Sequence, residues 1–287
     1  MQRQPAVRET QWPEIRNALL AFFWQSRPHV MRGTTEVDVT DSLAAIRRIE
    51  KELRIAVSFH AFAVYCVVQA AMQHPIMHTY RYGKKLLTFA DIDLLSPIDK
   101  RLPGGVRIPV GHILRSAQNK TLAEINWEIR QAVRAPDLAE DAAVQSRRRL
   151  ARSPYWVRRI WAWRCKRNPY LLKRISGTML VTNLQTHGAG NPMFALAGTA
   201  HTTSLAIGNI TPRLQLSREG TVVSRKMLCL SGAADHDIVD GMGIARFAHL
   251  LTRLLETGAG LDETFVQQTR KLIDKESHEQ RCVAVNS

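Results

Sequence analysis

The chain has 287 residues, of which 45% are hydrophobic and 23% are charged, and its formal net charge at pH 7 is +15. This composition excludes disorder of the whole chain and is typical of a globular protein with one large core or two modest cores. The longest apolar run, residues 61–72, is interrupted by Gln69 and is shorter than the ~20 residues that a membrane-spanning helix needs. Because the N-terminus also lacks the apolar core of a signal peptide, we expect a cytoplasmic protein.

The first third of the chain predicts helices around one strand. Residues 1–11 are polar and are expected to be flexible, and Trp12-Pro13 then opens a helix that extends to about residue 23. Residues 36–39 alternate between acidic residues and valine, as in a half-buried strand. Thr40-Asp41-Ser42 is expected to cap the next helix, whose apolar stripe runs over residues 43–53. Residues 58–73 are nearly all apolar, which predicts a helix buried on most sides.

The remaining elements alternate strands with helices. Residues 91–94 and 106–110 predict two strands around a turn at residues 102–105. Thr121 and Glu124 form a capping box that begins a helix. Buried strands are predicted at residues 179–182, 204–207 and 227–230. A long helix is striped by Ile244, Phe247, Leu251 and Leu254 and ends before Gly258. This order predicts a mixed α/β fold with one domain over residues 12–261, followed by a charged tail over residues 262–287.

Cysteine and histidine spacing gives no sign of a metal site or a bound cofactor. Cys66, Cys165, Cys229 and Cys282 are far apart, so we expect reduced thiols rather than disulfides or a zinc site. The histidines form no cluster with metal-ligand spacing. Neither the phosphate-binding nor the dinucleotide-binding glycine motif occurs, so the sequence does not support nucleotide hydrolysis or dinucleotide chemistry.

The positive charge is concentrated in one segment, because no Asp or Glu occurs between Asp141 and Glu219. Residues 147–174 form a basic and aromatic insert, in which 11 Lys and Arg alternate with tyrosine and tryptophan. Such a segment attracts anions. Candidate partners are nucleic acid, a membrane surface, the phosphates of a nucleotide-containing substrate and an acidic carrier protein, while a solvated face without a partner is the alternative.

The clearest chemical motif is His236-x-x-x-Asp240-Gly241, at the entry to the last long helix. An imidazole accepts a proton near neutral pH, and the glycine permits a tight turn of the backbone. The structural alternative is a histidine that caps the helix or is packed against it.

Four segments in order resemble the catalytic domain of the 2-oxo-acid dehydrogenase acyltransferases, the dihydrolipoyl transacylase family. They are Pro28-His29 with residues 35–39, residues 109–110 with 120–125, residues 177–184, and residues 235–241. This family shares its fold with chloramphenicol acetyltransferase. The resemblance therefore implies a two-layer mixed-sheet α/β sandwich of the chloramphenicol acetyltransferase-like type.

The resemblance also implies a homotrimer whose active sites lie at subunit interfaces. His236 would be the general base, and Thr182 of a neighbouring chain would donate a hydrogen bond to the oxyanion. Asp240, followed by Gly241, would hold the catalytic loop through an arginine. Arg16 is a candidate for that arginine, with a helix-surface role as the alternative.

This sequence departs from the family pattern near the chemistry and in its organisation. Asp237 follows the histidine where the family usually has arginine, and Gln185 stands where the family has glycine. A carboxylate beside His236 favours the imidazolium form, which weakens a base unless the carboxylate points away. The sequence has no lipoyl or subunit-binding domain, and the basic insert is foreign to the complex-forming enzymes.

We therefore predict a stand-alone acyltransferase that moves an acyl group from coenzyme A, or from an acidic acyl-carrier protein, to a small hydroxyl, amine or thiol acceptor. In this hypothesis the insert binds the donor or another anion through Arg158, Arg159, Arg164 and Arg167. Alternatively, its aromatic residues lie on a membrane surface over residues 153–174. Two other functions stay open: a catalytically silent trimeric scaffold, and a basic protein that binds membranes or nucleic acid. The latter leaves the four ordered segments unexplained.

Overall fold

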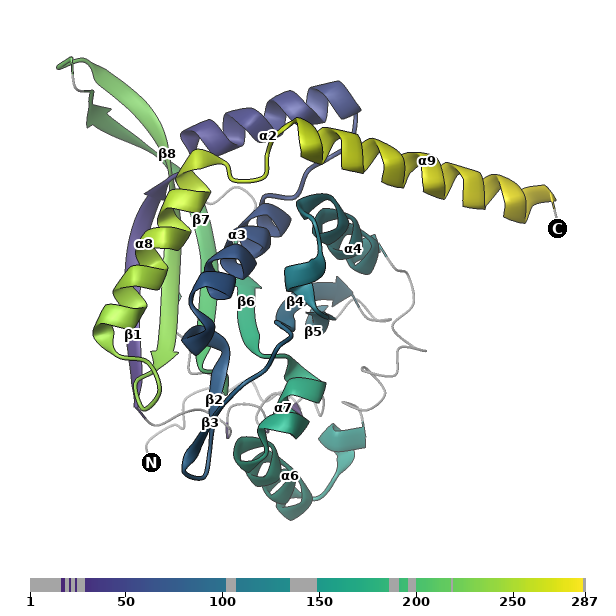
Figure 1. The fold of residues 1–287 in the computed structure, drawn as a ribbon. Coiled ribbons are helices and arrows are strands. Elements are labelled where there is room, and N and C mark those ends of the chain that lie inside the picture. Colours follow the sequence, from purple (N-terminus) through teal and green to yellow (C-terminus); the bar gives the residue numbers. More distant parts are fainter. Residues whose placement is uncertain are drawn as a thin grey trace, which may run out of the picture.

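The computed structural model describes residues 17, 18, 21, 24, 29–101, 107–134, 149–185, 191–195, 200–217 and 219–285. A mixed six-stranded sheet with the order β1-β8-β7-β6-β4-β5 is the centre of the fold (Figure 1). Its strands are β1 (Val30–Asp38), β4 (Leu94–Arg101), β5 (Arg107–Leu114), β6 (Met179–Asn183), β7 (Thr203–Leu216) and β8 (Val222–Asp235). Strand β6 runs parallel to β4 and β7, and the other pairs are antiparallel.

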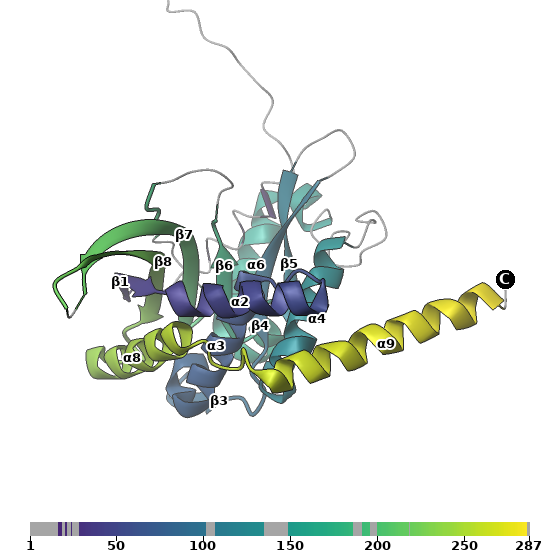
Figure 2. The same ribbon diagram turned by 90° about the horizontal axis from the view of Figure 1, so that it is seen from above.

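Helices cover one face of this sheet and make the second layer (Figure 2). They are α2 (Thr40–Leu53), α3 (Phe59–Gln73), α4 (Leu122–Arg134) and α8 (Gly241–Thr257). Helix α3 is buried on most sides, as its apolar sequence predicts. The main core cluster lies between the two layers and takes residues from all four helices and from most of the strands. The predicted two-layer α/β architecture is confirmed.

Local signals in the sequence set several element boundaries. The capping box is present, with Thr121 N donating to Glu124 Oε2 at 2.8 Å and Glu124 N donating to Thr121 Oγ1 at 3.3 Å. Gly258 ends α8 with a φ of 67°, a left-handed conformation that favours glycine. The predicted cap of α2 is wrong in detail, because the N-cap position is Val39 and the Thr40 amide donates to Asp38 Oδ1 at 3.0 Å, two residues before the predicted segment.

Some elements differ from the prediction or were not predicted. Strand β4 begins at Leu94 rather than at residue 91, because Asp93 is used in hydrogen bonds to a neighbouring loop. A small hairpin, β2 (Thr79–Tyr82) and β3 (Lys85–Thr88), and two short 3-10 helices, η1 (Pro75–His78) and η2 (Ala117–Asn119), were not predicted. The charged segment from residue 262 forms α9 (Glu263–Val285), which extends away from the domain (Figure 1). The N-terminal helix lies largely outside the described residues, and the turn at 102–105 lies wholly outside them.

The basic insert folds as α6 (Tyr155–Arg167) and α7 (Pro169–Ser176), at the lower end of the molecule in Figure 1. Buried Asp93 fixes it to the sheet, because its carboxylate accepts hydrogen bonds from Arg115 at 2.8 Å and from the Ser116 amide at 2.9 Å, and pairs with Lys173 at 3.0 Å. Burial alone would raise the pKa of Asp93, but these donors hold it below its usual value. The insert is therefore attached to the domain by a charged cluster in which the Asp93 carboxylate is bound by Arg115, Ser116 and Lys173.

Candidate active site

His236 lies at the junction where β8 ends and α8 begins. Its backbone amide donates to the carbonyl oxygen of His29 at 2.8 Å, which ties the junction to the start of β1. The amide of the buried Val239 donates a hydrogen bond to the carbonyl oxygen of Asp235 at 3.0 Å, which closes the turn. The imidazole of His236 is exposed in the single chain. A base in this position is accessible to a substrate or to another copy of the protein.

The carboxylate of Asp237 pairs with a different histidine from the one beside it in the sequence. Its Oδ1 lies 2.8 Å from Nδ1 of His29, and its amide donates to Asp235 Oδ1 at 3.1 Å. The contact of this carboxylate is therefore with His29 rather than with the neighbouring His236.

Asp240 begins α8 as its N-cap. Its Oδ1 accepts a hydrogen bond from the Gly243 amide at 2.6 Å, an interaction that stabilises a helix by about 1 kcal/mol. Asp240 therefore supports the junction in this chain, while Arg16, the arginine expected to pair with it, lies outside the described residues.

The tight-turn role predicted for Gly241 is not supported. Its φ is not positive, and a Cβ at this position would meet nothing within 4 Å. The closely packed glycine is Gly243, where a Cβ would lie 3.1 Å from Asp240 Oδ1. The sequence motif identified the turn, but the close approach occurs two residues later.

Thr182 lies on the opposite face of the sheet from the helices. Met179 and Val181 of the same strand are buried in the core, so the alternation of a strand turns Thr182 the other way. The side chain is half-buried, and its hydroxyl forms no hydrogen bond with any residue that the structure describes. The hydroxyl is therefore not held by a hydrogen bond to its own sheet.

His236 and Thr182 do not meet within one chain. Thr182 is level with Ala206 of β7, whereas β8 ends level with Thr203 and His236 lies beyond that point. With β7 between β6 and β8, the separation is about 17 Å along the strands and about 10 Å across them. A reaction that uses both side chains therefore requires a second copy of the chain.

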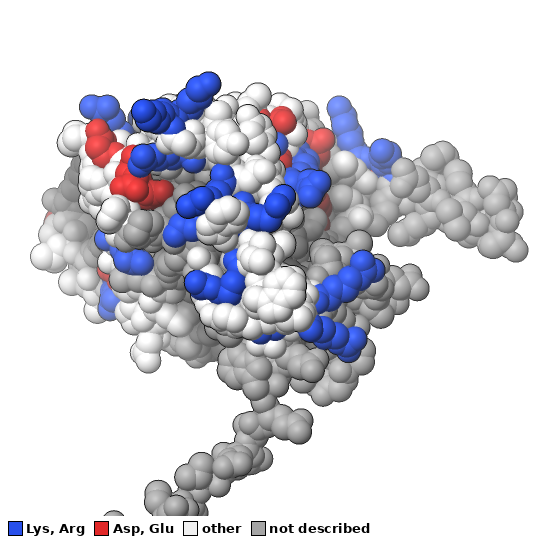
Figure 3. All heavy atoms as spheres, turned by 90° about the horizontal axis from the view of Figure 1, so that it is seen from below, with Lys and Arg blue, Asp and Glu red and all other residues white. Residues whose placement is uncertain are grey.

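The four arginines assigned to anion binding have different surroundings. Arg158 turns inward and donates to the carbonyl oxygens of Ala151 at 3.0 Å and Ser153 at 2.8 Å, so it holds the preceding loop. Arg159 lies over the ring of Trp24 at 5.2 Å, and Arg167 lies over that of Trp163 at 4.5 Å. Arg159, Arg164 and Arg167 are exposed, and Lys and Arg side chains are spread over this side of the molecule (Figure 3).

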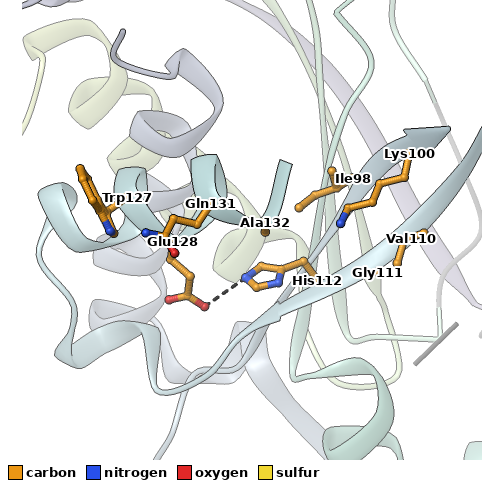
Figure 4. A pocket seen from close by; sticks show the side chains of 9 residues that line it. All are labelled: Ile98, Lys100, Val110, Gly111, His112, Trp127, Glu128, Gln131 and Ala132. Atoms are coloured by element: carbon orange, nitrogen blue, oxygen red, sulfur yellow. Dashed lines mark hydrogen bonds and ion pairs between the residues drawn. The ribbon is translucent and has the colours of Figure 1, made fainter. Parts of the chain in front are cut away.

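A second histidine–carboxylate pair, which the sequence did not single out, lies at the other edge of the sheet. His112 of β5 is directed toward Glu128 of α4, with Nε2 and Oε1 3.0 Å apart, and Lys120 binds the other carboxylate oxygen (Figure 4). Burial alone would raise the pKa of Glu128, but His112 and Lys120 hold it below its usual value. The pair lines an open pocket of about 540 Å³ between β4, β5 and α4. Among the described residues that line this pocket there is no Ser, Thr or Cys, so they provide an oriented imidazole without a hydroxyl or thiol nucleophile.

Two Ser–His pairs in the interior also resemble parts of a catalytic site. His60 Nε2 lies 2.6 Å from Ser96 Oγ, and His201 Nε2 lies 3.0 Å from Ser176 Oγ. All four residues are buried, and burial lowers the pKa of His60 to about 4. A substrate has no access to them, and they serve the packing of the core.

Other groups that carry chemistry are inert or dispersed. Cys66, Cys165 and Cys229 are free and buried, and burial raises the pKa of each thiol. In the ranges that the structure describes, no three His, Cys, Asp or Glu side chains gather in a way that would hold a metal ion. Nor does any described helix combine the length and hydropathy that crossing a membrane requires.

Comparison with known proteins gives a match over most of the chain. Residues 6–140 and 174–261 match the model of the 2-oxoacid dehydrogenases acyltransferase (catalytic domain), so residues 141–173 fall outside the match. A search of curated protein sequences returned no match.

Solved structures of low sequence identity share the fold. A probable dihydrolipoamide acetyltransferase from Listeria monocytogenes is 18% identical over 88% of this chain and 95% of that chain, with a TM-score of 0.62. The Azotobacter vinelandii dihydrolipoamide acetyltransferase is 14% identical over 91% and 99%, with a TM-score of 0.61. The cubic core of the pyruvate dehydrogenase multienzyme complex is 14% identical over 91% and 99%, with a TM-score of 0.56. The predicted chloramphenicol acetyltransferase-like fold is confirmed.

Proposed function

The chain belongs to the family of 2-oxoacid dehydrogenase acyltransferases (catalytic domain), and on this premise we propose that it transfers acyl groups from a thioester donor to a small acceptor. The donor is an acyl-coenzyme A or an acyl-carrier protein, and the acceptor carries a hydroxyl, an amine or a thiol. The observation that carries the proposal is the placement of His236, an exposed imidazole at a rigid strand–helix junction whose neighbouring carboxylate is bound to His29.

In the proposed reaction His236 acts as the general base. It removes the proton from the acceptor as the acceptor attacks the thioester carbonyl, a contribution of typically ~10²–10⁴ in rate. The carbonyl oxygen becomes an oxyanion, and the hydroxyl of Thr182 from a second chain donates a hydrogen bond to it. When the intermediate collapses, the carbon–sulfur bond breaks and the leaving thiolate takes the proton from the His236 imidazolium. The base is thereby regenerated.

We propose a homotrimer as the active assembly. The separation of His236 and Thr182 within one chain supports a site shared between chains. The arm formed by the ends of β7 and β8 projects from the domain and exposes Leu214, Leu216 and Val222, with Leu214 at 76% (Figure 1). An apolar arm of this kind supports contact with another protein surface. One similar structure is described as a cubic core, which is consistent with self-association in the family.

Complementation between two inactive variants tests the shared site. Chains with His236→Ala and chains with Thr182→Ala, carrying different tags, are coexpressed, and assemblies that hold both tags are purified. Every mixed cyclic trimer has one interface at which an intact His236 meets an intact Thr182, so we expect about one third of wild-type activity in a thiol-release assay. Assemblies of wild-type chains and double-variant chains are the control.

Three outcomes separate the proposal from its alternatives. No recovery in the mixed assemblies, with both parent variants inactive, would contradict the shared site. Equal turnover by wild type and His236→Ala across a panel of acyl-coenzyme A donors would refute His236 as the base. No turnover by wild type with any donor or acceptor would favour the catalytically silent trimeric scaffold.

A second function is supported by the outer face of α6, for which we propose binding to an anionic membrane surface. The exposed apolar residues Trp156, Ile160 and Trp163 recur at helical spacing, with Trp156 at 63% exposure. Exposed arginines lie between them. Phosphate recognition alone needs only the charges, whereas a lipid surface also accommodates exposed tryptophan at the headgroup level.

Vesicle sedimentation distinguishes these partners. We expect binding to phosphatidylglycerol vesicles and none to phosphatidylcholine vesicles, with loss of binding in a Trp156→Ala, Trp163→Ala variant and in an Arg164→Gln, Arg167→Gln variant. Arg47→Gln with Arg48→Gln, on the exposed side of α2, is the matched charge control. If removing the arginines raises the KM for the acyl donor while neither variant affects vesicle binding, the insert binds the donor rather than a membrane.

A further inference from the structure

A largely apolar cavity of about 220 Å³ lies between α8 and the helix-facing side of β1, β7 and β8. Large side chains of α8, including Ile244, Phe247 and Leu251, form one wall. The facing strands contribute the small residues Gly33, Gly232 and Ala234 beside the larger Met31, Leu205 and Leu230. Because small residues of the sheet stand opposite large residues of the helix, the two layers leave a space that no side chain of the described residues fills.

Gly33 shows that this space is open. It lies on the same side of β1 as Val37, a core residue that faces the helices. A Cβ built on Gly33 would meet nothing within 4 Å, and its φ is not positive, so the backbone does not require glycine. Gly33 is exposed, so this side of the cavity is open to solvent, and an open apolar site beside the core is a candidate binding site.

One buried polar side chain in the cavity lining, that of Thr203, has no partner among the described residues. Thr203 is 2% exposed, and its hydroxyl forms no hydrogen bond with the described part of the protein. A buried hydroxyl without a partner costs free energy, which a bound oxygen atom relieves. The lining also includes Thr34, Thr35, Thr252 and the exposed Arg32, but most of the remaining walls are apolar and fit an aliphatic group.

The cavity also lies beside the proposed base. Met31 and Ala234, which pair across β1 and β8, are part of its lining, and His236 follows Ala234 by two residues. The backbone hydrogen bond from His236 to His29 lies just beyond this pair. A chain that lies in the cavity therefore has its end near the junction of β8 and α8.

We infer that this cavity binds the acyl chain of the donor and selects chains of medium length. A dry cavity of about 150 Å³ holds benzene, so by scaling this one holds an aliphatic chain of roughly eight carbons. The chain lies under α8 and its thioester end faces His236, so that the carbonyl oxygen is left for the hydrogen bond proposed from Thr182 of a second chain. This inference rests on the proposed acyl transfer and adds the class of acyl group.

Filling the cavity tests the inference. Gly33→Val narrows it from the sheet and Ala248→Leu narrows it from α8, while Ala245→Leu adds the same bulk on an exposed part of α8 outside the lining. Transfer rates are measured with acyl-coenzyme A donors from acetyl to dodecanoyl. We expect wild type and Ala245→Leu to prefer hexanoyl to decanoyl donors. Each filling variant should lose at least about tenfold in kcat/KM for octanoyl while acetyl transfer stays within about threefold.

Binding without turnover separates this inference from the proposed reaction. In a His236→Ala background, calorimetry with octanoyl- and acetyl-coenzyme A should show tighter binding of the octanoyl donor, and Gly33→Val should abolish the difference. Thermal denaturation should show that the filling variants stay folded. An unchanged chain-length preference in both folded filling variants overturns the inference even if transfer occurs. Chain-selective binding that Gly33→Val removes, without any turnover in the wild type, retains the cavity and rejects the enzyme.

Discussion

The β8–α8 junction and the β4–β5–α4 edge each place a histidine near a carboxylate, with opposite results. At the junction, Asp237 is the sequence neighbour of His236 but pairs with His29, and the imidazole of His236 stays exposed. At the other edge, Glu128 lies 16 residues from His112 and binds it directly. The difference shows that adjacency in the sequence does not decide which carboxylate orients an imidazole. The better-oriented imidazole, that of His112, lies in a pocket whose described lining residues include no Ser, Thr or Cys.

The largest expected effect contrasts the two histidines directly. His236→Ala should lower the acyl-transfer rate by ~10²–10⁴, because a general base is lost. His112→Ala should change it by less than about threefold, since its pocket contains no residue proposed for catalysis. Initial rates of thiol release, with thermal denaturation as a check of folding, measure both. A larger loss in His112→Ala than in His236→Ala would move the candidate site to the β4–β5–α4 edge.

The next effect concerns the hydroxyl of Thr182, which is proposed to act together with His236 and not with His112. Thr182→Ala should lower kcat by about 10²–10³, the effect of losing one oxyanion donor, while Thr182→Ser should stay within about fivefold of wild type because it keeps the hydroxyl. A comparison of kcat and KM separates this role from substrate binding. If Thr182→Ser is as slow as Thr182→Ala, the methyl group or the packing matters and the oxyanion role is wrong.

A third prediction concerns His60, a buried histidine whose partner Ser96 lies on β4 of the β4–β5–α4 edge. The folded pKa of His60, about 4, lies below its unfolded value of about 6.5, so folding favours the neutral imidazole. Above about pH 6.5 the imidazole is neutral in both the folded and the unfolded state. As the pH falls toward 4, the unfolded state gains a proton that the folded state does not, so the free energy of unfolding falls by about 3 kcal/mol. Urea denaturation of wild type and His60→Asn at pH 7 and pH 4.5 should show a smaller acid loss in the variant. Equal losses would contradict the burial effect.

The smallest expected effect tests whether Asp237 acts on His236. Asp237→Asn keeps a hydrogen-bond partner for His29 but removes the charge from an exposed pair, so activity at pH 7 should change by less than about threefold. The pH dependence of kcat/KM should keep its shape. A more than tenfold rise in activity at pH 6 would show that the carboxylate controls the protonation of His236 despite its contact with His29.

Much of the fold could be predicted because its signals are local. The capping box at Thr121, the stripe of α8 and the apolar sequence of α3 each depend on residues close together in the chain. Helix α6 was not predicted, because its aromatic and arginine residues give it no clear apolar stripe. The short helix α7 is amphipathic and was also not predicted. Its attachment through Asp93 joins positions about 80 residues apart, for which a single sequence carries no signal.

The candidate site divides in the same way. The sequence by itself determined the residue types, the order of the four family segments and the strand–helix junction that holds His236. Only the tertiary structure decided that Asp237 turns to His29, that Gly243 rather than Gly241 makes the close approach, and that small residues from β1 and β8 leave a cavity under α8. The physical reason is that periodicity and capping are properties of short segments. Pairing partners, exposure and empty volume depend instead on which distant segments the sheet brings together.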